Sequence, residues 1–236
     1  MAAEATLRKL EFVTEQPAAD RLRTAYQQRH ESDYVFRFGT AFAWCVLTAG
    51  VYSLYILSQL VRRSRDHNRR RLELLEAAAA FTWEQAQARG LTDDLRPEFE
   101  RVSRQMRVLG GLTNAFRDPA LWVVLTLVTG GVAQYVAWIL LDRDLVRHEE
   151  AEREIESDLA AIYARLGRPI TDVDPSPPKG RHNVVGRIIA TIASLGFYAI
   201  WWMRDVMNDG NAHFEENWRF EDDLARASRS LLATQS

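Results

Sequence analysis

The chain has 236 residues, a formal net charge of −2 and a single cysteine, Cys45. This charge argues against a nucleic-acid-binding protein, because such proteins need surplus positive charge to release counterions. One cysteine excludes an internal disulfide and a cysteine-based metal cluster. The chain also lacks the sequence motifs of serine hydrolases, zinc proteases and phosphate-binding loops. We therefore predict a protein that is not an enzyme and needs no cofactor.

Three apolar runs interrupt an otherwise charged chain. Phe38 to Val61 is uncharged for 24 residues, Pro119 to Leu141 for 23, and Ile188 to Met203 for 16. An uncharged run of about 18 or more residues is typical of a membrane-spanning helix. We therefore predict an all-α integral membrane protein in the cell membrane.

The runs divide the chain into repeats with connecting segments. In order, we predict an N-terminal amphipathic segment (1–35), repeat one (36–90), a helical insert (91–118), repeat two (119–166), a Pro-rich linker (167–182), and repeat three with the C-terminal tail (183–236). Gly90 predicts the end of the helix of repeat one, and Gly110 with Gly111 predicts the end of the insert helix.

Each run contains the same short pattern: TAGVYSLY, TGGVAQYVAW or SLGFYAIWW. A hydroxyl residue precedes a glycine by two positions in every copy, and a histidine follows that glycine by seventeen. The hydroxyl and glycine pairs are Thr48 and Gly50, Thr129 and Gly131, and Ser194 and Gly196; the histidines are His67, His148 and His213. This common spacing predicts a threefold internal repeat with a turn at the T-x-G positions.

Apolar residues also recur at heptad spacing after each glycine, for example Leu74, Ile155 and Phe220 at position +24. Heptad spacing places side chains along one seam of a supercoiled helix. We therefore expect each repeat to continue as one long amphipathic tail helix, and the tails to join copies of the chain into a homo-oligomer.

Two topologies fit the apolar runs. Each run either spans the bilayer, or enters it for about eleven residues, turns at the T-x-G and returns. Eleven helical residues rise about 17 Å, roughly half of the hydrocarbon thickness. The hairpin explains the short third run and the recurring turn residues, but its backbone polar groups need partners inside protein.

A basic block follows the first run: Arg62, Arg63, Arg65, Arg69, Arg70 and Arg71. Basic residues beside a membrane segment favour the cytoplasmic side, so we expect mainly cytoplasmic tail helices. The block is also a candidate site for anionic lipid headgroups. Orientation alone would also explain the block, and it is the interpretation that we favour.

The three histidines allow three interpretations. They are candidate metal ligands, because imidazole binds zinc, copper and nickel. They are also a candidate pH switch, because protonation below about pH 6.5 would bring like charges together. The third interpretation is structural, with each histidine hydrogen-bonded to a neighbouring helix.

The T-x-G-[VF]-Y pattern with following aromatics and a charged helix resembles a family of prokaryotic membrane proteins catalogued as domain of unknown function 4234. The likeness is best from Ser194 to Trp202, fair from Thr48 to Tyr55, and poor in repeat two, where Ala133 replaces the tyrosine. The resemblance implies a membrane protein with repeats, located in a bacterial inner membrane, and brings no activity with it.

The function that we expect is a non-enzymatic membrane scaffold whose partners are a lipid bilayer and other copies of the chain. Shallow hairpins entering from one side would organise or curve the membrane. The first alternative is a small oligomeric channel or transporter subunit lined by Ser53, Gln134 and Ala199. The second is a metal or pH sensor that uses the three histidines.

Overall fold

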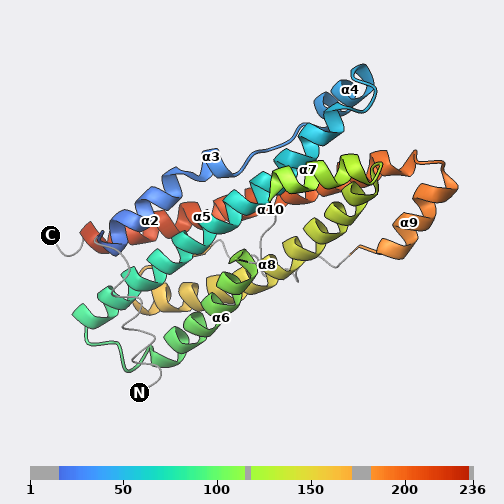
Figure 1. Ribbon diagram of the computed structural model, residues 1–236. Helices are drawn as coiled ribbons and strands as arrows, with labels where there is room; N and C mark the ends of the chain where they lie inside the picture. The colour runs from blue at the N-terminus through green and yellow to red at the C-terminus, as the bar shows by residue number, and fades with distance from the viewer. Residues whose placement is uncertain (1–15, 115–117, 172–181, 234–236) are drawn as a thin grey trace.

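The computed structural model describes residues 16–114, 118–171 and 182–233, which form an elongated bundle of α-helices without a strand (Figure 1). Its helices are α2 (Ala18–Gln27), α3 (Arg29–Ser32), α4 (Phe38–Leu47), α5 (Tyr52–Ala88), α6 (Arg96–Asn114), α7 (Pro119–Val128), α8 (Val132–Arg165), α9 (Val184–Ala193) and α10 (Tyr198–Ala233). The all-α prediction is confirmed. Residues 1–15 of the predicted N-terminal segment and 172–181 of the predicted linker lie outside the described residues.

The three repeats share one plan. A ten-residue helix (α4, α7 or α9) is followed by a turn and then by a helix of 34 to 37 residues (α5, α8 or α10). Every turn falls at the T-x-G positions. At about 1.5 Å per residue, the long helices extend for roughly 50–55 Å, and they form the length of the bundle.

Among the described residues, no helix has both the length and the apolar character needed to cross a bilayer. The predictions of an integral membrane protein, of transmembrane helices and of a location in the bacterial inner membrane are therefore wrong. Those predictions counted uncharged residues along the chain. The turn divides each uncharged run between a ten-residue helix and the start of a long helix that is charged further on.

The insert contributes a fourth major helix, α6, which packs between α5 and α8. As predicted, Gly90 marks the end of this helix: α5 ends at Ala88, and Gly90 follows with a φ of +68° that suits glycine. The Leu91 N–H donates to the Ala86 carbonyl at 2.9 Å and so pairs one of the last carbonyls of α5. The predicted stop at Gly110 and Gly111 is wrong, because α6 continues through both glycines to Asn114. A glycine costs a helix only about 1 kcal/mol, which buried neighbours can offset.

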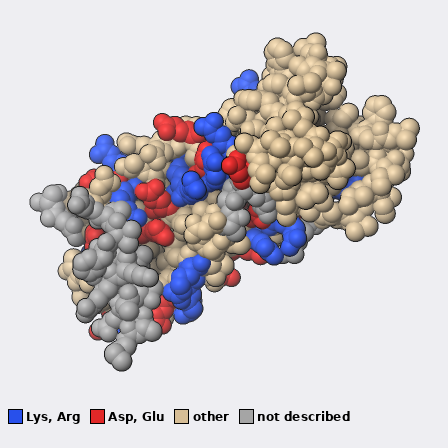
Figure 2. Space-filling view, in the orientation of Figure 1, with Lys and Arg blue, Asp and Glu red and all other residues tan. Residues whose placement is uncertain are grey.

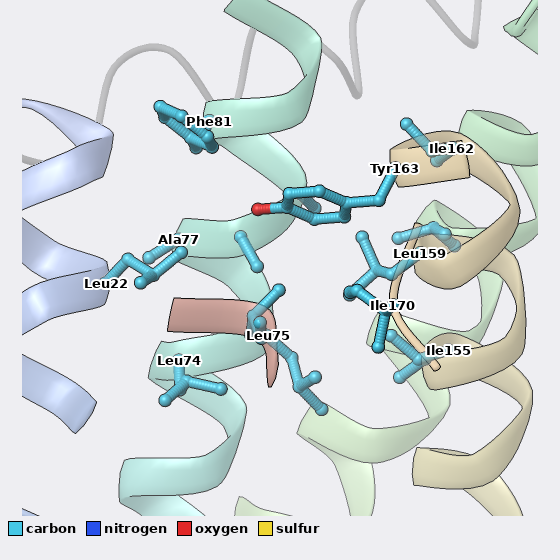
Figure 3. Close-up of a cluster of buried hydrophobic side chains, with 14 of the residues drawn as sticks. Leu22, Leu74, Leu75, Ala77, Phe81, Ile155, Leu159, Ile162, Tyr163 and Ile170 are labelled. Carbon is cyan, nitrogen blue, oxygen red and sulfur yellow. The ribbon is translucent and has the colours of Figure 1, made fainter. Parts of the chain in front are cut away.

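The bundle has two apolar cores. The larger one lies away from the turns and joins α2, α5, α6, α8 and α10 around side chains such as Leu74, Phe81, Leu159 and Tyr163 (Figure 3). The smaller core lies nearer the turns and contains Ile56, Leu57, Trp138, Trp202 and Met207, among others. Between them, the long helices bury polar and charged side chains instead.

The predicted heptad seams face one another inside one chain. Leu74, Ile155 and Phe220 are each at most 1% exposed and belong to the same core. The seam therefore joins the three repeats of a single molecule. A homo-oligomer stays a prediction, and it would have to use surfaces other than this seam.

One close approach connects the long helices of repeats one and three. The Arg63 guanidinium is buried against α10, where its Nη2 donates to the carbonyls of Val206 at 3.2 Å and Met207 at 3.0 Å. A Cβ atom at Gly210 would lie 2.4 Å from that same Nη2 and 3.0 Å from Cζ. Gly210 therefore provides the space that the guanidinium occupies. Burial lowers the pKa of Arg63 to about 9.

We expect Gly210→Ala to lower the free energy of unfolding by about 1–2 kcal/mol. The methyl group displaces Arg63 from its carbonyl acceptors, and this loss outweighs the helix preference of alanine. Chemical denaturation measures the effect. The matched control is Gly111→Ala, also within a helix but with nothing within 4 Å of the added Cβ, which should stabilise the protein by up to about 1 kcal/mol. Equal stability of the two variants would show that Arg63 moves without cost.

Candidate functional site

The three turns have the same backbone conformation. Each contains two successive residues with positive φ, the second being the glycine of the T-x-G pattern. The φ values are +47° and +91° at Ala49 and Gly50, +59° and +96° at Gly130 and Gly131, and +51° and +92° at Leu195 and Gly196. A φ near +90° is accessible chiefly to glycine, which explains why glycine occupies this position three times.

The hydroxyl residue of each turn makes two hydrogen bonds. Thr48 Oγ1 donates to the Trp44 carbonyl at 2.8 Å and accepts from the Tyr52 N–H at 3.0 Å. Thr129 and Ser194 likewise accept from the N–H four residues ahead, at 3.0 and 2.9 Å, and donate to a carbonyl of the preceding helix. The hydroxyl thereby joins the short helix to the start of the long one.

These bonds complete the pairing of the N–H groups in the turns. Each glycine N–H donates to the carbonyl five residues earlier at 2.8 Å. Every backbone N–H in 48–53, 129–134 and 194–199 has an acceptor within the protein. Such complete pairing is what a turn needs when water is absent, because an unpaired N–H then costs several kcal/mol.

All three turns lie at one end of the bundle (Figure 1). Their side chains are apolar and exposed: Leu47 is 75% exposed, Val128 79% and Leu195 91%. Figure 2 shows this end as a broad surface almost without charged residues, whereas Lys, Arg, Asp and Glu gather along the rest of the bundle. We call this surface the apolar end. Its exposed large hydrophobic residues include Trp44, Val46, Leu47, Val51, Leu121, Val124, Leu127, Val128, Val132, Ile189, Ile192, Leu195, Phe197 and Trp201.

A second feature is a buried polar layer between the two apolar cores. It contains seam positions +17 and +21 of each repeat: His67 and Arg71, His148 and Glu152, and His213 and Asn217. Arg71 is fully buried and forms ion pairs with Glu152, Glu156 and Glu221. These three carboxylates raise the pKa of Arg71 despite its burial, so the guanidinium stays charged.

Asp33, in the segment after α3, extends this layer. Its carboxylate lies 2.8 Å from His67 Nδ1 and accepts hydrogen bonds from Arg70 Nη2 at 2.9 Å and Trp218 Nε1 at 2.7 Å. Burial raises the pKa of Asp33, but His67, Arg70 and a hydrogen bond from Ser32 outweigh it and hold the pKa well below its usual range.

The structure brings two of the predicted histidines together directly. The rings of His67 and His213 lie 5.3 Å apart, and the ligand atoms of His67, Glu152 and His213 all lie within 4.8 Å of one another. His148 is buried nearby and acts electrostatically on Glu152 and His213. Burial lowers the pKa of His213 to about 3, although Glu152 acts in the opposite direction. The pH switch stays a prediction.

The candidate headgroup arginines divide into two groups. Arg62 and Arg69 are exposed and Arg65 is half-buried, so these three remain accessible. Arg63, Arg70 and Arg71 are at most 5% exposed. The lipid-headgroup assignment is therefore wrong for these three, because their guanidinium groups serve the interior of the bundle.

The acidic residues of the layer were not predicted as site residues. Asp33, Glu156 and Glu221 look like ordinary solvent-facing acids in the sequence. A signal was available for two of them: Glu156 and Glu221 both occupy position +25, one helical turn after the seam position of Arg71. Asp33 carries no such signal because it lies outside the repeats.

No family model matches this chain, and comparisons with curated proteins and with solved structures found no match either. The resemblance to domain of unknown function 4234 therefore stays a prediction.

We expect Asp33→Asn to destabilise the protein by about 2–4 kcal/mol at pH 7, because buried His67 and Arg70 lose a charged partner. The folded pKa of Asp33 is below its unfolded value of 3.8, so its contribution is present above that pH and disappears as pH falls. Denaturation at pH 7 and pH 3 should show the difference from wild type shrinking in acid.

Asp66→Asn is the matched control, because Asp66 is a partly exposed carboxylate on α5 that pairs with Arg62 and Arg65. Its loss should cost less than about 1 kcal/mol. An Asp33→Asn effect as small as this control would contradict the role given to Asp33.

Proposed function

We propose that the protein binds the surface of a lipid bilayer by inserting its apolar end into one leaflet, and acts there as a non-enzymatic scaffold. The observation that carries this proposal is the pairing of every backbone N–H in three exposed, apolar turns. In water the turns would not need such pairing, whereas in hydrocarbon they would.

The apolar end also has an unusual concentration of exposed hydrophobic side chains. Leu195 combines 91% exposure with a φ of +51°, a backbone region that a leucine rarely adopts. In water, neither the strained backbone of Leu195 nor the exposure of its side chain contributes favourable free energy. In a leaflet its side chain is solvated by acyl chains. Large exposed apolar patches mark interaction surfaces in general.

The dimensions of the short helices suit one leaflet. Ten residues rise about 15 Å, and half of the hydrocarbon core is also about 15 Å. Arg62 and Arg143 are exposed and each follows its turn glycine by twelve residues, about 18 Å along the helix. This places two guanidinium groups near the depth of the phosphates, which arginine binds in a bidentate manner.

A scaffold role follows from the number of hairpins. Three hairpins on one rigid bundle enter the same leaflet side by side, and the charged bundle stays outside. The volume of the three hairpins expands the leaflet that they enter relative to the other leaflet. This difference favours a membrane that is convex on the side of the protein. The channel alternative receives no support from the described residues, since it depended on spanning segments.

Vesicle flotation tests the proposal. We expect wild type to float with phosphatidylcholine vesicles, and more strongly when phosphatidylserine is added. Leu47→Glu, Val128→Glu and Leu195→Glu should each reduce binding about 10–100-fold, because each places a carboxylate in hydrocarbon. Because these side chains are exposed, the folded bundle should keep its circular dichroism spectrum and melting temperature.

The matched control is Val108→Glu on α6, a residue 53% exposed and outside the apolar end, which should bind vesicles like wild type. The alternative partner for the apolar end is a second copy of the chain. Light scattering of the lipid-free protein tests whether such a dimer forms. A wild-type dimer that Val128→Glu converts to a monomer, with no vesicle binding by either protein, would replace the lipid proposal by a dimer interface.

A further inference from the structure

Hydrogen bonds fix the tautomers of two buried histidines. His67 Nδ1 lies 2.8 Å from a carboxylate oxygen of Asp33, so in the neutral ring Nδ1 is the donor and Nε2 carries a lone pair. His148 Nδ1 lies 2.9 Å from the Asp144 carbonyl, which likewise leaves Nε2 as the lone-pair atom. A histidine held by a carboxylate or a carbonyl through one nitrogen is the usual arrangement of a metal ligand.

Too few hydrogens are available for the acceptors in this layer. The Asn217 side-chain nitrogen Nδ2 lies 3.3 Å from His67 Nε2, 3.3 Å from His213 Nε2 and 3.0 Å from Glu152 Oε2. An amide group has two hydrogens and faces three acceptors. The second oxygen of Glu152, Oε1, and His148 Nε2 are buried without a hydrogen-bond donor among the described residues. The two imidazole nitrogens and Glu152 Oε2 around Asn217 therefore have one acceptor more than the amide can serve, which an ion bound by these atoms would explain.

The separations suit a tetrahedral metal complex. Metal distances of 2.0–2.2 Å to nitrogen and oxygen give separations between ligand atoms of about 3.3–3.6 Å. The observed values are 3.0 to 3.3 Å from the Asn217 amide to its three neighbours and 3.7 Å between His213 Nε2 and Glu152 Oε2. The ligand atom of His67 lies within 4.8 Å of those of His213 and Glu152, so ligands that are farther apart than in the complex would move together when the ion binds. In the flipped orientation of the Asn217 side-chain amide, the carbonyl oxygen Oδ1 and the nitrogen Nδ2 exchange positions. Oδ1 then faces the same three neighbours as a ligand. We propose that His67, His213, Glu152 and Asn217 bind one divalent transition-metal ion.

The charges of the surrounding layer favour a cation. Asp33, Glu152 and Glu221 supply three buried carboxylates, whereas Arg70 and Arg71 supply two guanidinium groups, which leaves one negative charge in excess. Burial raises the pKa of Glu156 to about 7, so this residue adds at most one further negative charge at neutral pH. Arg63, bound to backbone carbonyls one helical turn before His67, reduces the excess to at most one. Arg71 Nε lies 3.5 Å from Glu152 Oε2, so this oxygen already has a positive neighbour. Oε1 has no such partner and is the other oxygen that this carboxylate can present to an ion.

A cavity adjoins two of the proposed ligands. A cavity of about 40 Å³ is lined by His67 and His213 and also by the half-buried carboxylates Asp142 and Asp209. Asp142 and Asp209 form a second cluster with His182, less buried than the first. An ion passing this cluster would meet oxygen and nitrogen ligands before it reaches the buried ones. The bound ion would join α5, α8 and α10, with at least one ligand from each repeat.

Zn²⁺ and Co²⁺ are the probes for this site. We expect chelator-treated protein to bind one Zn²⁺ per chain in calorimetry. A hundredfold excess over Kd should raise the melting temperature by about 5–10 °C. Co²⁺ should give the intense visible absorption of a tetrahedral complex. His213→Gln should abolish the shift and the absorption band, whereas the matched variant His182→Gln should keep both.

Asn217→Asp keeps the test decisive if His213→Gln does not fold. It adds a carboxylate to the site, so the metal-free variant should melt below wild type and Zn²⁺ should raise its melting temperature by more than in wild type. Absence of Zn²⁺ binding by wild type would overturn the proposal. Binding lost in His182→Gln and kept in His213→Gln would also overturn it, since the ion would then occupy the outer cluster. Neither measurement depends on binding to lipid.

Discussion

The arrangement of the bundle depends on the burial of Arg71 among three carboxylates. A fully buried guanidinium is tolerated only when its charge is matched, and the partners come from different repeats: Glu152 and Glu156 from α8, and Glu221 from α10. A slip of one helix by a single turn would leave uncompensated charges in the interior. The polar layer therefore specifies the register of the three long helices, which the apolar seam alone would specify less strictly.

The register of the long helices also determines where the turns at their N-terminal ends lie. Each turn glycine lies 21 residues before its layer position, about 31 Å along a straight helix. Because the three layer positions are aligned, the three turns are aligned as well and project from one end (Figure 1). The smaller core around Trp138 and Trp202 fills the space between the layer and the turns. Alignment of the ion pairs thus produces a shared apolar end.

Local patterns in the sequence predicted the features that are local. The breaks at Thr48, Thr129 and Ser194 follow from short-range hydrogen bonds, and the seam follows from heptad spacing. The burial of Arg70 and Arg71 could not be read in this way, because Glu221 lies 151 and 150 residues further along the chain. A run of arginines looks the same whether its partners are phosphates or distant carboxylates. Only the packing of the repeats distinguishes these cases.

The side chains explain why the three repeats belong to one chain. The backbone is repeated faithfully at the turns, but position +21 holds Arg71, Glu152 and Asn217, three residues of different charge. Three identical repeats would place three arginines or three glutamates together in the interior, where like charges repel strongly. A covalently joined set can instead place one positive, one negative and one neutral side chain in the same layer. Symmetry at the apolar end and asymmetry in the layer therefore require three repeats of different sequence, which a single chain supplies in a fixed ratio.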